Sequence, residues 1–257
     1  MRGLLGSAYA LLISVLFAMV SPATGDDRSG IVMGVIGIKN GGPMMDGTVF
    51  FFDQNSGPPP SATKYWRVPT HFFPIDSEAR FSAVLPEGTY YFGAIERNTG
   101  ETLGPPQEGD FFFISQDEKG RPRKLTVRKG SMTDLGMVVE AVPFKRAMLA
   151  RKGTTSIEGV IRDRQGKPVE GMAVIGFKSP TMMGLPVFVS ERSDKGGRYL
   201  LRVDRGGTYY LRARSNYGPG FPAKGELMGV YKDGKPVSVK TSTSRKGINI
   251  EVFNFGM

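Results

Sequence analysis

The sequence lacks cysteine altogether and has one histidine and one tryptophan among its 257 residues. Without cysteine the chain can form no disulfide, no thiolate metal site and no covalent haem attachment, so its fold must rely on core burial. The single histidine, His71, cannot supply the two histidines of a catalytic zinc site, and no G-x-S-x-G motif accompanies it for a serine triad. The composition therefore favours a protein that is not an enzyme, and it predicts no metal site and no cofactor. We expect His71 to be a partly buried loop residue.

Long apolar runs are also scarce, since only residues 4–20 form one. This run follows Arg2 and precedes a small-residue site made of Ala23 and Gly25, which is the pattern of a secretory signal. We therefore expect residues 1–25 to be a signal peptide and the protein to be periplasmic, at the cell surface or extracellular. Because the run is longer than in most signals, an uncleaved N-terminal anchor is an alternative. No second run of about 18 apolar residues occurs, so no transmembrane segment is expected in the mature chain.

The net charge of +10 is unevenly distributed. Residues 26–143 carry 12 basic against 15 acidic side chains, whereas residues 154–257 carry 17 against 9. The basic character therefore belongs to the second half and to the short segment before it. A basic surface attracts anionic partners. In an exported protein we expect these to be an envelope protein, an anionic polysaccharide or a lipid surface, and we expect no nucleic acid.

The tetrapeptide GTYY occurs twice, at 88–91 and 207–210, and the sequence around it is repeated as well. Residues 34–52 are similar to residues 159–177, because both contain GVI, a glycine-bearing turn, a proline and then an apolar stretch. The order of the similar segments is the same in both halves. This repetition indicates two copies of one module.

The repeat predicts where the modules begin and end. We expect a first module at 26–143, a basic linker at 144–153 and a second module at 154–257. The first module diverges from the second by a long insert at 53–75, which is rich in proline and aromatic residues.

Apolar residues alternate with polar or small ones on both sides of each GTYY, which is typical of strands with one face in a core. The alternating positions are Phe81, Ala83, Leu85, Tyr90, Phe92 and Ala94 in the first copy, and Tyr199, Leu201, Val203, Tyr209, Leu211 and Ala213 in the second. We expect 80–95 and 198–214 to be β-hairpins. The first tyrosine of each GTYY should face the core and the second should face outward.

The same patterns predict further strands between turns that are rich in glycine and proline. Their ranges are 31–38, 47–53, 109–115, 134–142, 155–162, 171–178, 186–192 and 247–255. Only residues 144–151 could form a short turn of helix. Many short strands with frequent turns predict an all-β protein made of two tandem β-sandwiches.

The second half resembles a known family in "IEGVIRDRQGKPVEGMAVIGF" and "SDKGGRYLLRVDRGGTYYLRARS". These segments are similar to the carboxypeptidase regulatory-like domain, and the resemblance covers 155–214. It implies a transthyretin-like, Ig-like sandwich in both modules. It implies little about chemistry, because such domains are mostly non-catalytic accessories.

Carboxylates offer the main alternative to a purely binding role. Glu108 and Asp110 are two residues apart and could share one side of a strand, where they could do acid–base work or bind calcium. The simpler interpretation is a solvated strand end or a turn cap. Asp194 matches the turn position of the family, where its side chain would cap the turn backbone.

Two surface features are candidate binding sites. Four arginines, Arg198, Arg202, Arg212 and Arg214, are expected on one face of adjacent strands, where they would bind an anionic partner. The alternative is a solvated basic face that aids solubility.

The second candidate lies in the insert, where Tyr65, Trp66 and Arg67 stand on a proline-bounded loop. Aromatic side chains on a loop suit stacking on sugars or filling a pocket of a partner. The alternative is a loop that folds back and plugs the open end of a sandwich.

These observations lead to an exported, non-enzymatic binding or assembly protein of the cell envelope. A carbohydrate-binding module protein is the alternative, and a hydrolase that uses Glu108 and Asp110 is the third interpretation. The segments "GPPP…YWRVP" and "LPEGTYYFGAIER" also resemble exported proteins found alongside multihaem cytochromes in metal-reducing bacteria, which implies such a cytochrome as a further partner.

Overall fold

The computed structural model describes residues 28–98, 101, 103–150, 152–218, 220 and 222–256. The expected signal peptide at 1–25 lies outside these residues. Strands dominate the described chain, and its only helices are three short 3-10 helices, so the prediction of an all-β fold is confirmed. One of them, η2 at Arg146–Met148, lies where the sequence predicts a short helical turn. None of the described helices has the length and apolar character needed to span a membrane.

The first module forms an eight-stranded sheet in the order β3-β2-β5-β6-β8-β1-β4, with β7 paired to β5. The strands are β1 Ser29–Ile38, β2 Thr48–Asp53, β3 His71–Pro74, β4 Arg80–Pro86, β5 Gly88–Glu96, β6 Phe111–Ile114, β7 Leu125–Val127 and β8 Met132–Pro143. Strand β8 joins two layers, because most of it pairs with β1 and its last residues pair with β6. The sheet therefore folds into a sandwich with β4, β1 and β8 in one layer.

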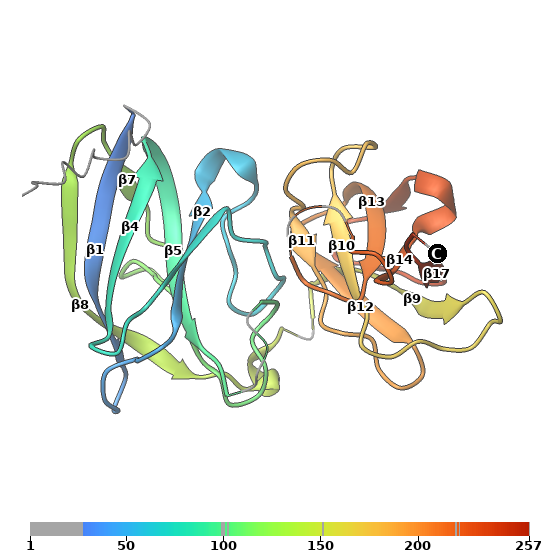
Figure 1. The fold of residues 1–257 in the computed structure, drawn as a ribbon, viewed down its shortest axis with the longest axis horizontal. Coiled ribbons are helices and arrows are strands. Elements are labelled where there is room, and N and C mark those ends of the chain that lie inside the picture. The colour runs from blue at the N-terminus through green and yellow to red at the C-terminus, as the bar shows by residue number, and fades with distance from the viewer. Residues whose placement is uncertain are drawn as a thin grey trace, which may run out of the picture.

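The second module repeats this topology in a nine-stranded sheet with the order β11-β10-β13-β14-β17-β9-β12. Its strands are β9 Thr155–Asp163, β10 Ala173–Phe177, β11 Phe188–Val189, β12 Arg198–Val203, β13 Gly207–Arg214, β14 Leu227–Val230, β15 Val237–Val239, β16 Ser244–Arg245 and β17 Ile250–Asn254. Strands β16 and β17 together take the place of β8, and β15 pairs with β13 as β7 pairs with β5. Figure 1 shows the two sandwiches side by side along the chain.

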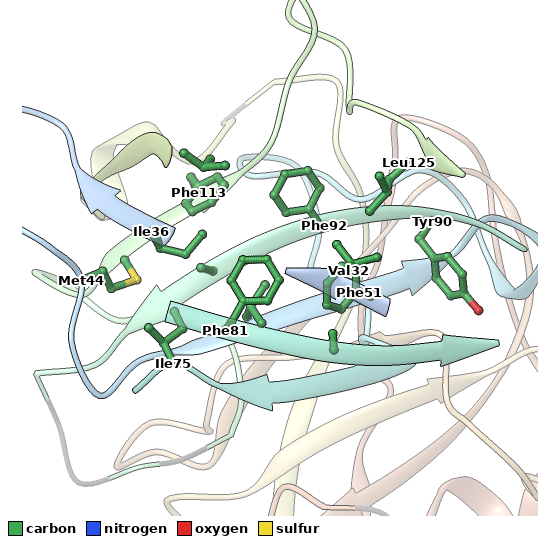
Figure 2. Close-up of a cluster of buried hydrophobic side chains, with 14 of the residues drawn as sticks. Val32, Ile36, Met44, Phe51, Ile75, Phe81, Tyr90, Phe92, Phe113 and Leu125 are labelled. Atoms are coloured by element: carbon green, nitrogen blue, oxygen red, sulfur yellow. The ribbon is translucent and has the colours of Figure 1, made fainter. Parts of the chain in front are cut away.

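Each sandwich is filled by the alternating residues that the sequence singles out. In the first core Phe51 of β2 lies 6.4 Å, between ring centroids, from Phe81 of β4 in the opposite layer. It also stacks on Phe92 of the neighbouring β5. Figure 2 shows these rings packed together with aliphatic side chains between the layers. The second core is built in the same way around Phe188, Tyr199 and Tyr209.

The expected hairpins are wrong. Strands β4 and β5 are consecutive but do not pair, because β4 pairs with β1 in one layer and β5 pairs with β2, β6 and β7 in the other. Strands β12 and β13 are separated in the same way. Period-two alternation specifies which side chains face the core, but a strand beside its neighbour and a strand across the core from it have the same pattern. The chain crosses from one layer to the other at each GTYY.

The first tyrosine of each GTYY stabilises the turn at which the chain passes from one layer to the other. Tyr90 and Tyr209 lie in the two cores, as predicted. The hydroxyl of each donates to a backbone carbonyl four residues earlier, at Pro86 over 3.0 Å and at Arg205 over 2.7 Å. For the second tyrosine the prediction is wrong in the first module, where Tyr91 is buried by the second module.

Both modules also share a bulge opposite the first strand. The pairing of β1 with β8 shifts by one residue near Gly136, and the pairing of β9 with β16 and β17 shifts by one residue near Gly247. Both glycines have positive φ, which favours glycine. Facing the second bulge, Gly159 has no room for a side chain, because a Cβ there would lie 1.9 Å from the carbonyl oxygen of Ile248.

We expect Gly159→Ala to destabilise the second module by about 3 kcal/mol or more, since backbone must move to admit the methyl group. The matched control is Gly42→Ala, which meets no atom within 4 Å. That change should stay within about 0.5 kcal/mol of the wild type. Urea unfolding followed by circular dichroism measures both, and equal stability of the two variants would refute the close packing.

Candidate binding site at the junction of the two modules

The insert of the first module pairs with the edge of the second sheet through a single β-bridge. The amide of Val189 donates to the carbonyl of Trp66 over 3.1 Å, and the amide of Val68 donates to the carbonyl of Val187 over 2.9 Å. Arg67 and Phe188 form the β-bridge between them. The edge of the second sheet at β11 is therefore covered by backbone from the first module, which ties the modules together.

Tyr65 plugs the second sandwich. Its ring packs edge-on against Phe188, with 5.6 Å between ring centroids, and it joins the second hydrophobic core. Its hydroxyl donates to the carbonyl of Pro59 over 2.6 Å. Burial, helped by the charge of Asp204, raises the pKa of Tyr65 to about 12. The insert thus plugs a sandwich, but the one that it plugs belongs to the other module.

Trp66 is only 7% exposed and lies at the centre of the junction. It meets Phe112 and Phe144 edge-on, with ring centroids 6.1 and 5.7 Å away. The surrounding apolar cluster comes from the outer face of β2, β5 and β6, from the linker and from the second module: Phe50, Phe52, Tyr91, Ile95, Ile114, Ala173 and Val189 complete it. An indole packed in this way has little surface left for stacking on a sugar.

Arg67 holds the insert in shape. Its guanidinium donates to the carbonyls of Pro58 and Asp53 and to the hydroxyl of Ser56, and it lies over the ring of Phe52. Burial lowers the pKa of Arg67 to about 10, although Asp53 opposes that shift. Because these contacts occupy the guanidinium, Arg67 serves the junction and is not free to bind a partner.

Ion pairs border the apolar contact. Arg146 of the linker pairs with Glu191 over 3.2 Å, and Arg192 pairs with Glu101 of the first module. Arg192 also lies over the ring of Tyr217, 4.6 Å from its centroid. These contacts tie the linker and both modules together at the border of the buried cluster.

The structure does not bring the four arginines together, so the prediction of one basic face is wrong. Arg198 and Arg202 stand on β12, whereas Arg212 and Arg214 stand on β13 in the opposite layer. The expected common face depended on a hairpin, and the layer crossing at GTYY removes it. Arg214 is buried and forms two hydrogen bonds to Glu226, over 2.8 and 2.9 Å.

The remaining arginines divide in the same way. Arg212 lies over the ring of Phe177 and donates to the carbonyl of Met182. Arg198 and Arg202 have no ion-pair partner within the part of the chain that the structure describes. Only these two stay available to an anionic ligand.

Two pockets open at the junction, and Trp66 lines both. One is an apolar pocket of about 290 Å³, walled chiefly by Phe50, Phe52, Trp66, Phe112, Val189 and Tyr217. The other is a polar pocket of about 530 Å³, where Trp66 and Leu200 meet Arg146, Glu158, Arg198 and Arg202. The first has the size and lining of a small-ligand or side-chain pocket. The second holds charges of both signs.

The carboxylates that would support hydrolysis are occupied elsewhere. Asp110 is buried and accepts the amides of Asn98 and Gln107, both over 2.9 Å. Glu108 accepts the amide of Arg146 over 2.8 Å. Asp194 caps its turn by accepting two backbone amides. Each of these carboxylates therefore stabilises local backbone.

His71 and the acidic residues form no metal site in the described chain, where no three histidine or acidic side chains gather. His71 stands on β3 and not in a loop, with its ring 6.0 Å from that of Tyr90. Burial lowers the pKa of His71, and Asp53 opposes this shift.

No family model matches the sequence, and no curated protein matches it. Among solved structures, the Bacillus anthracis TIE protein is 9% identical with a TM-score of 0.28, over 88% of this chain and 34% of that one. A leucine-rich repeat protein from Bacteroides thetaiotaomicron is 11% identical with a TM-score of 0.25, over 87% of this chain and 26% of that one. This chain therefore spans well under two thirds of the length of both.

The shaft pilin SpaA from Lactobacillus rhamnosus GG is 13% identical with a TM-score of 0.24, over 90% of this chain and 98% of that one. These scores are too low to support conclusions about function, which must come from the residues of this chain. The resemblance to carboxypeptidase regulatory-like domains stays a prediction.

We expect Trp66→Ala to destabilise the protein by about 3–5 kcal/mol and to loosen the junction, because it removes the side chain that both modules contact. Urea unfolding gives the loss of stability, and small-angle X-ray scattering gives the change in radius of gyration. Tyr65→Phe is the control, since it keeps the ring in the second core and loses one hydroxyl contact. An unchanged radius of gyration with unchanged stability would contradict the role of Trp66.

The buried pair of Arg214 and Glu226 makes stability depend on pH. The hydrogen bonds from Arg214 lower the pKa of Glu226, although burial opposes them. A lowered folded-state pKa contributes stability that is present above the unfolded value of about 4.3 and is lost as pH falls through the folded value. Glu226→Gln should therefore be less stable than the wild type at pH 7, with the gap narrowing below pH 4. A gap that is independent of pH in urea titrations would refute this.

Proposed function

We propose that this chain is an exported, non-enzymatic binding protein of the cell envelope, and that its binding site is the apolar pocket at the junction. One observation carries this proposal: the pocket is walled by aromatic rings from both modules. The modules are held in one arrangement by the strand pairing of the insert. A pocket whose walls are fixed before binding loses little entropy when a ligand enters.

The lining selects the kind of ligand. Phe50, Phe52, Phe112 and Tyr217 supply apolar surface, and proline residues from the insert and from residues 105–106 also line the pocket. Such a pocket suits an apolar or aromatic side chain that a partner protein presents, in the way that anchor residues fill pockets at protein interfaces. Two arginines, Arg67 and Arg97, also line the pocket. Backbone carbonyls accept from both, and Arg97 also pairs with Asp110, so neither guanidinium is free to bind a charged ligand.

The envelope as location rests on the sequence, where residues 1–25 have the pattern of a secretory signal. The hydrogen bonds of Glu108, Asp110 and Asp194 to backbone amides support a role without catalysis. The resemblance to carboxypeptidase regulatory-like domains agrees with a binding or assembly role. A multihaem cytochrome is one partner that the resemblance suggests.

Carbohydrate binding is the second candidate, and the polar pocket favours it. Arg198 and Arg202 line that pocket without ion-pair partners among the described residues, beside Glu158. Guanidinium groups can bind the carboxylates of an acidic polysaccharide through paired hydrogen bonds. In this case Trp66 would line the sugar site without stacking on the sugar ring.

The pocket is tested by capture from native envelope extracts with three matched forms of the protein. Leu185 lies at the rim of the apolar pocket and is 53% exposed, whereas Met183, two residues away, is 71% exposed and does not line it. Leu185→Asp should lose the partner that the wild type captures, because it places a charge at the mouth of the pocket, and Met183→Asp should keep it.

Equal capture by Leu185→Asp would contradict the apolar site. The carbohydrate alternative is tested in parallel with a panel that includes acidic polysaccharides. It requires binding that is lost in Arg198→Ala and Arg202→Ala and kept in Arg162→Ala, since Arg162 is exposed on β9 and lies outside the pocket.

A further inference from the structure

The outer face of β4, β1 and β8 in the first module is apolar although it faces solvent. We name it the Met/Val face, and its residues are Ile31, Met33, Val84, Met132, Met137 and Val139. The strand register places them in rows across the three strands, such as Val84–Ile31–Met132. Met137 is 72% exposed and Met132 is 66% exposed. Large apolar side chains gathered in this way on a surface mark an interaction site.

The second module provides an internal comparison. The shared topology and register place Glu158 of the second module where the first has Met33, and Arg202 where the first has Val84. Further along the same face, Ser244, Asn249 and Glu251 take the places of Met132, Met137 and Val139. One fold therefore carries the same face twice. It is mostly apolar in the first module and mostly polar in the second, where Glu158 and Arg202 line the polar junction pocket. The strand geometry does not require the apolar side chains.

The Met/Val face is separate from the junction. The second module covers the outer face of β2, β5 and β6, which is the opposite layer of the first sandwich. In Figure 1, β8, β1 and β4 lie at the end of the first module that points away from the second. A partner on this face would leave the junction pockets open.

We propose that the Met/Val face binds a second copy of this chain. Charge placement argues for a copy. Among the described residues in the rows of this face, the charged ones are Arg80 on β4 and Asp134 on β8, which flank the central β1. A two-fold axis parallel to β1 places β4 of one copy over β8 of the other. Arg80, which pairs with Glu78 over 3.2 Å within its own chain, then lies one row along the strands from Asp134 of its mate, and this approach occurs twice. Sheets that pack face to face keep their strands within about 30° of each other, which suits this arrangement.

The size of the face sets the strength of the contact. Three strands about 4.8 Å apart and about seven residues long present roughly 330 Å² of sheet. Stable interfaces bury about 800 Å² on each partner. The dimer is therefore reversible and depends on concentration. Methionine, whose side chain adapts its shape, suits a contact between two identical surfaces.

The test is sedimentation equilibrium of the exported full chain over a wide concentration range. The wild type should form a dimer, and Met137→Glu should weaken it by about a hundredfold or more, because it buries a charge without a partner. The matched control is Met183→Glu, the same substitution at a methionine that is 71% exposed and lies outside the Met/Val face, which should leave the dimer unchanged. Circular dichroism checks that each variant is folded.

A charge swap tests the geometry. Arg80→Asp and Asp134→Arg should each weaken the dimer, and the double variant should restore it. A wild type that stays monomeric at all concentrations would overturn the proposal, as would a dimer that Met137→Glu leaves intact. Failure of the double variant to restore association would overturn the two-fold arrangement. Binding of the face to lipid vesicles in place of a second copy would overturn the choice of partner.

Discussion

The pairing of the insert with β11 is the contact on which the rest of the structure depends. Two backbone hydrogen bonds, between Trp66 and Val189 and between Val68 and Val187, extend the second sheet with chain from the first module. They fix the register of the insert, which carries Tyr65 into the second core and Trp66 into the junction. Two sandwiches joined only by a basic linker would move independently. Here backbone of the first module is hydrogen-bonded to the edge of the second sheet.

The two faces of the first module follow from this contact. The outer side of β2, β5 and β6 is apolar because the second module covers it, and the pockets lie where this cover is incomplete. The Met/Val face on the other layer is left uncovered by the residues that the structure describes. The first module thus has two apolar outer faces. One packs against the second module of the same chain, and the other is exposed to a partner. The second module has, besides its main core, a smaller buried cluster of Ile175, Phe177 and Met182.

Much of the fold can be predicted from the alternation of apolar and polar residues along the strands. The alternation around GTYY places Tyr90 and Tyr209 in their cores, and most predicted strands match those observed within a few residues. The same alternation cannot separate a hairpin from a crossing between layers, so the four arginines were expected together and stand apart. The runs VFFF at 49–52 and FFFI at 111–114 do predict the contact between the modules, because a strand that is apolar on both faces is usually covered on both faces. Nothing local in the insert predicts β11 as its partner, because that pairing depends on residues more than a hundred positions away.

Amide hydrogen exchange at Val68 and Val189 tests the central contact most directly. If the insert is paired with the edge of the second sheet, both amides should be protected for as long as those of core strands such as β10, and they should open together with the second module. Rapid exchange of both, with β10 still protected, would mean that the modules are not joined by this pairing, and the junction pockets would then have no fixed walls.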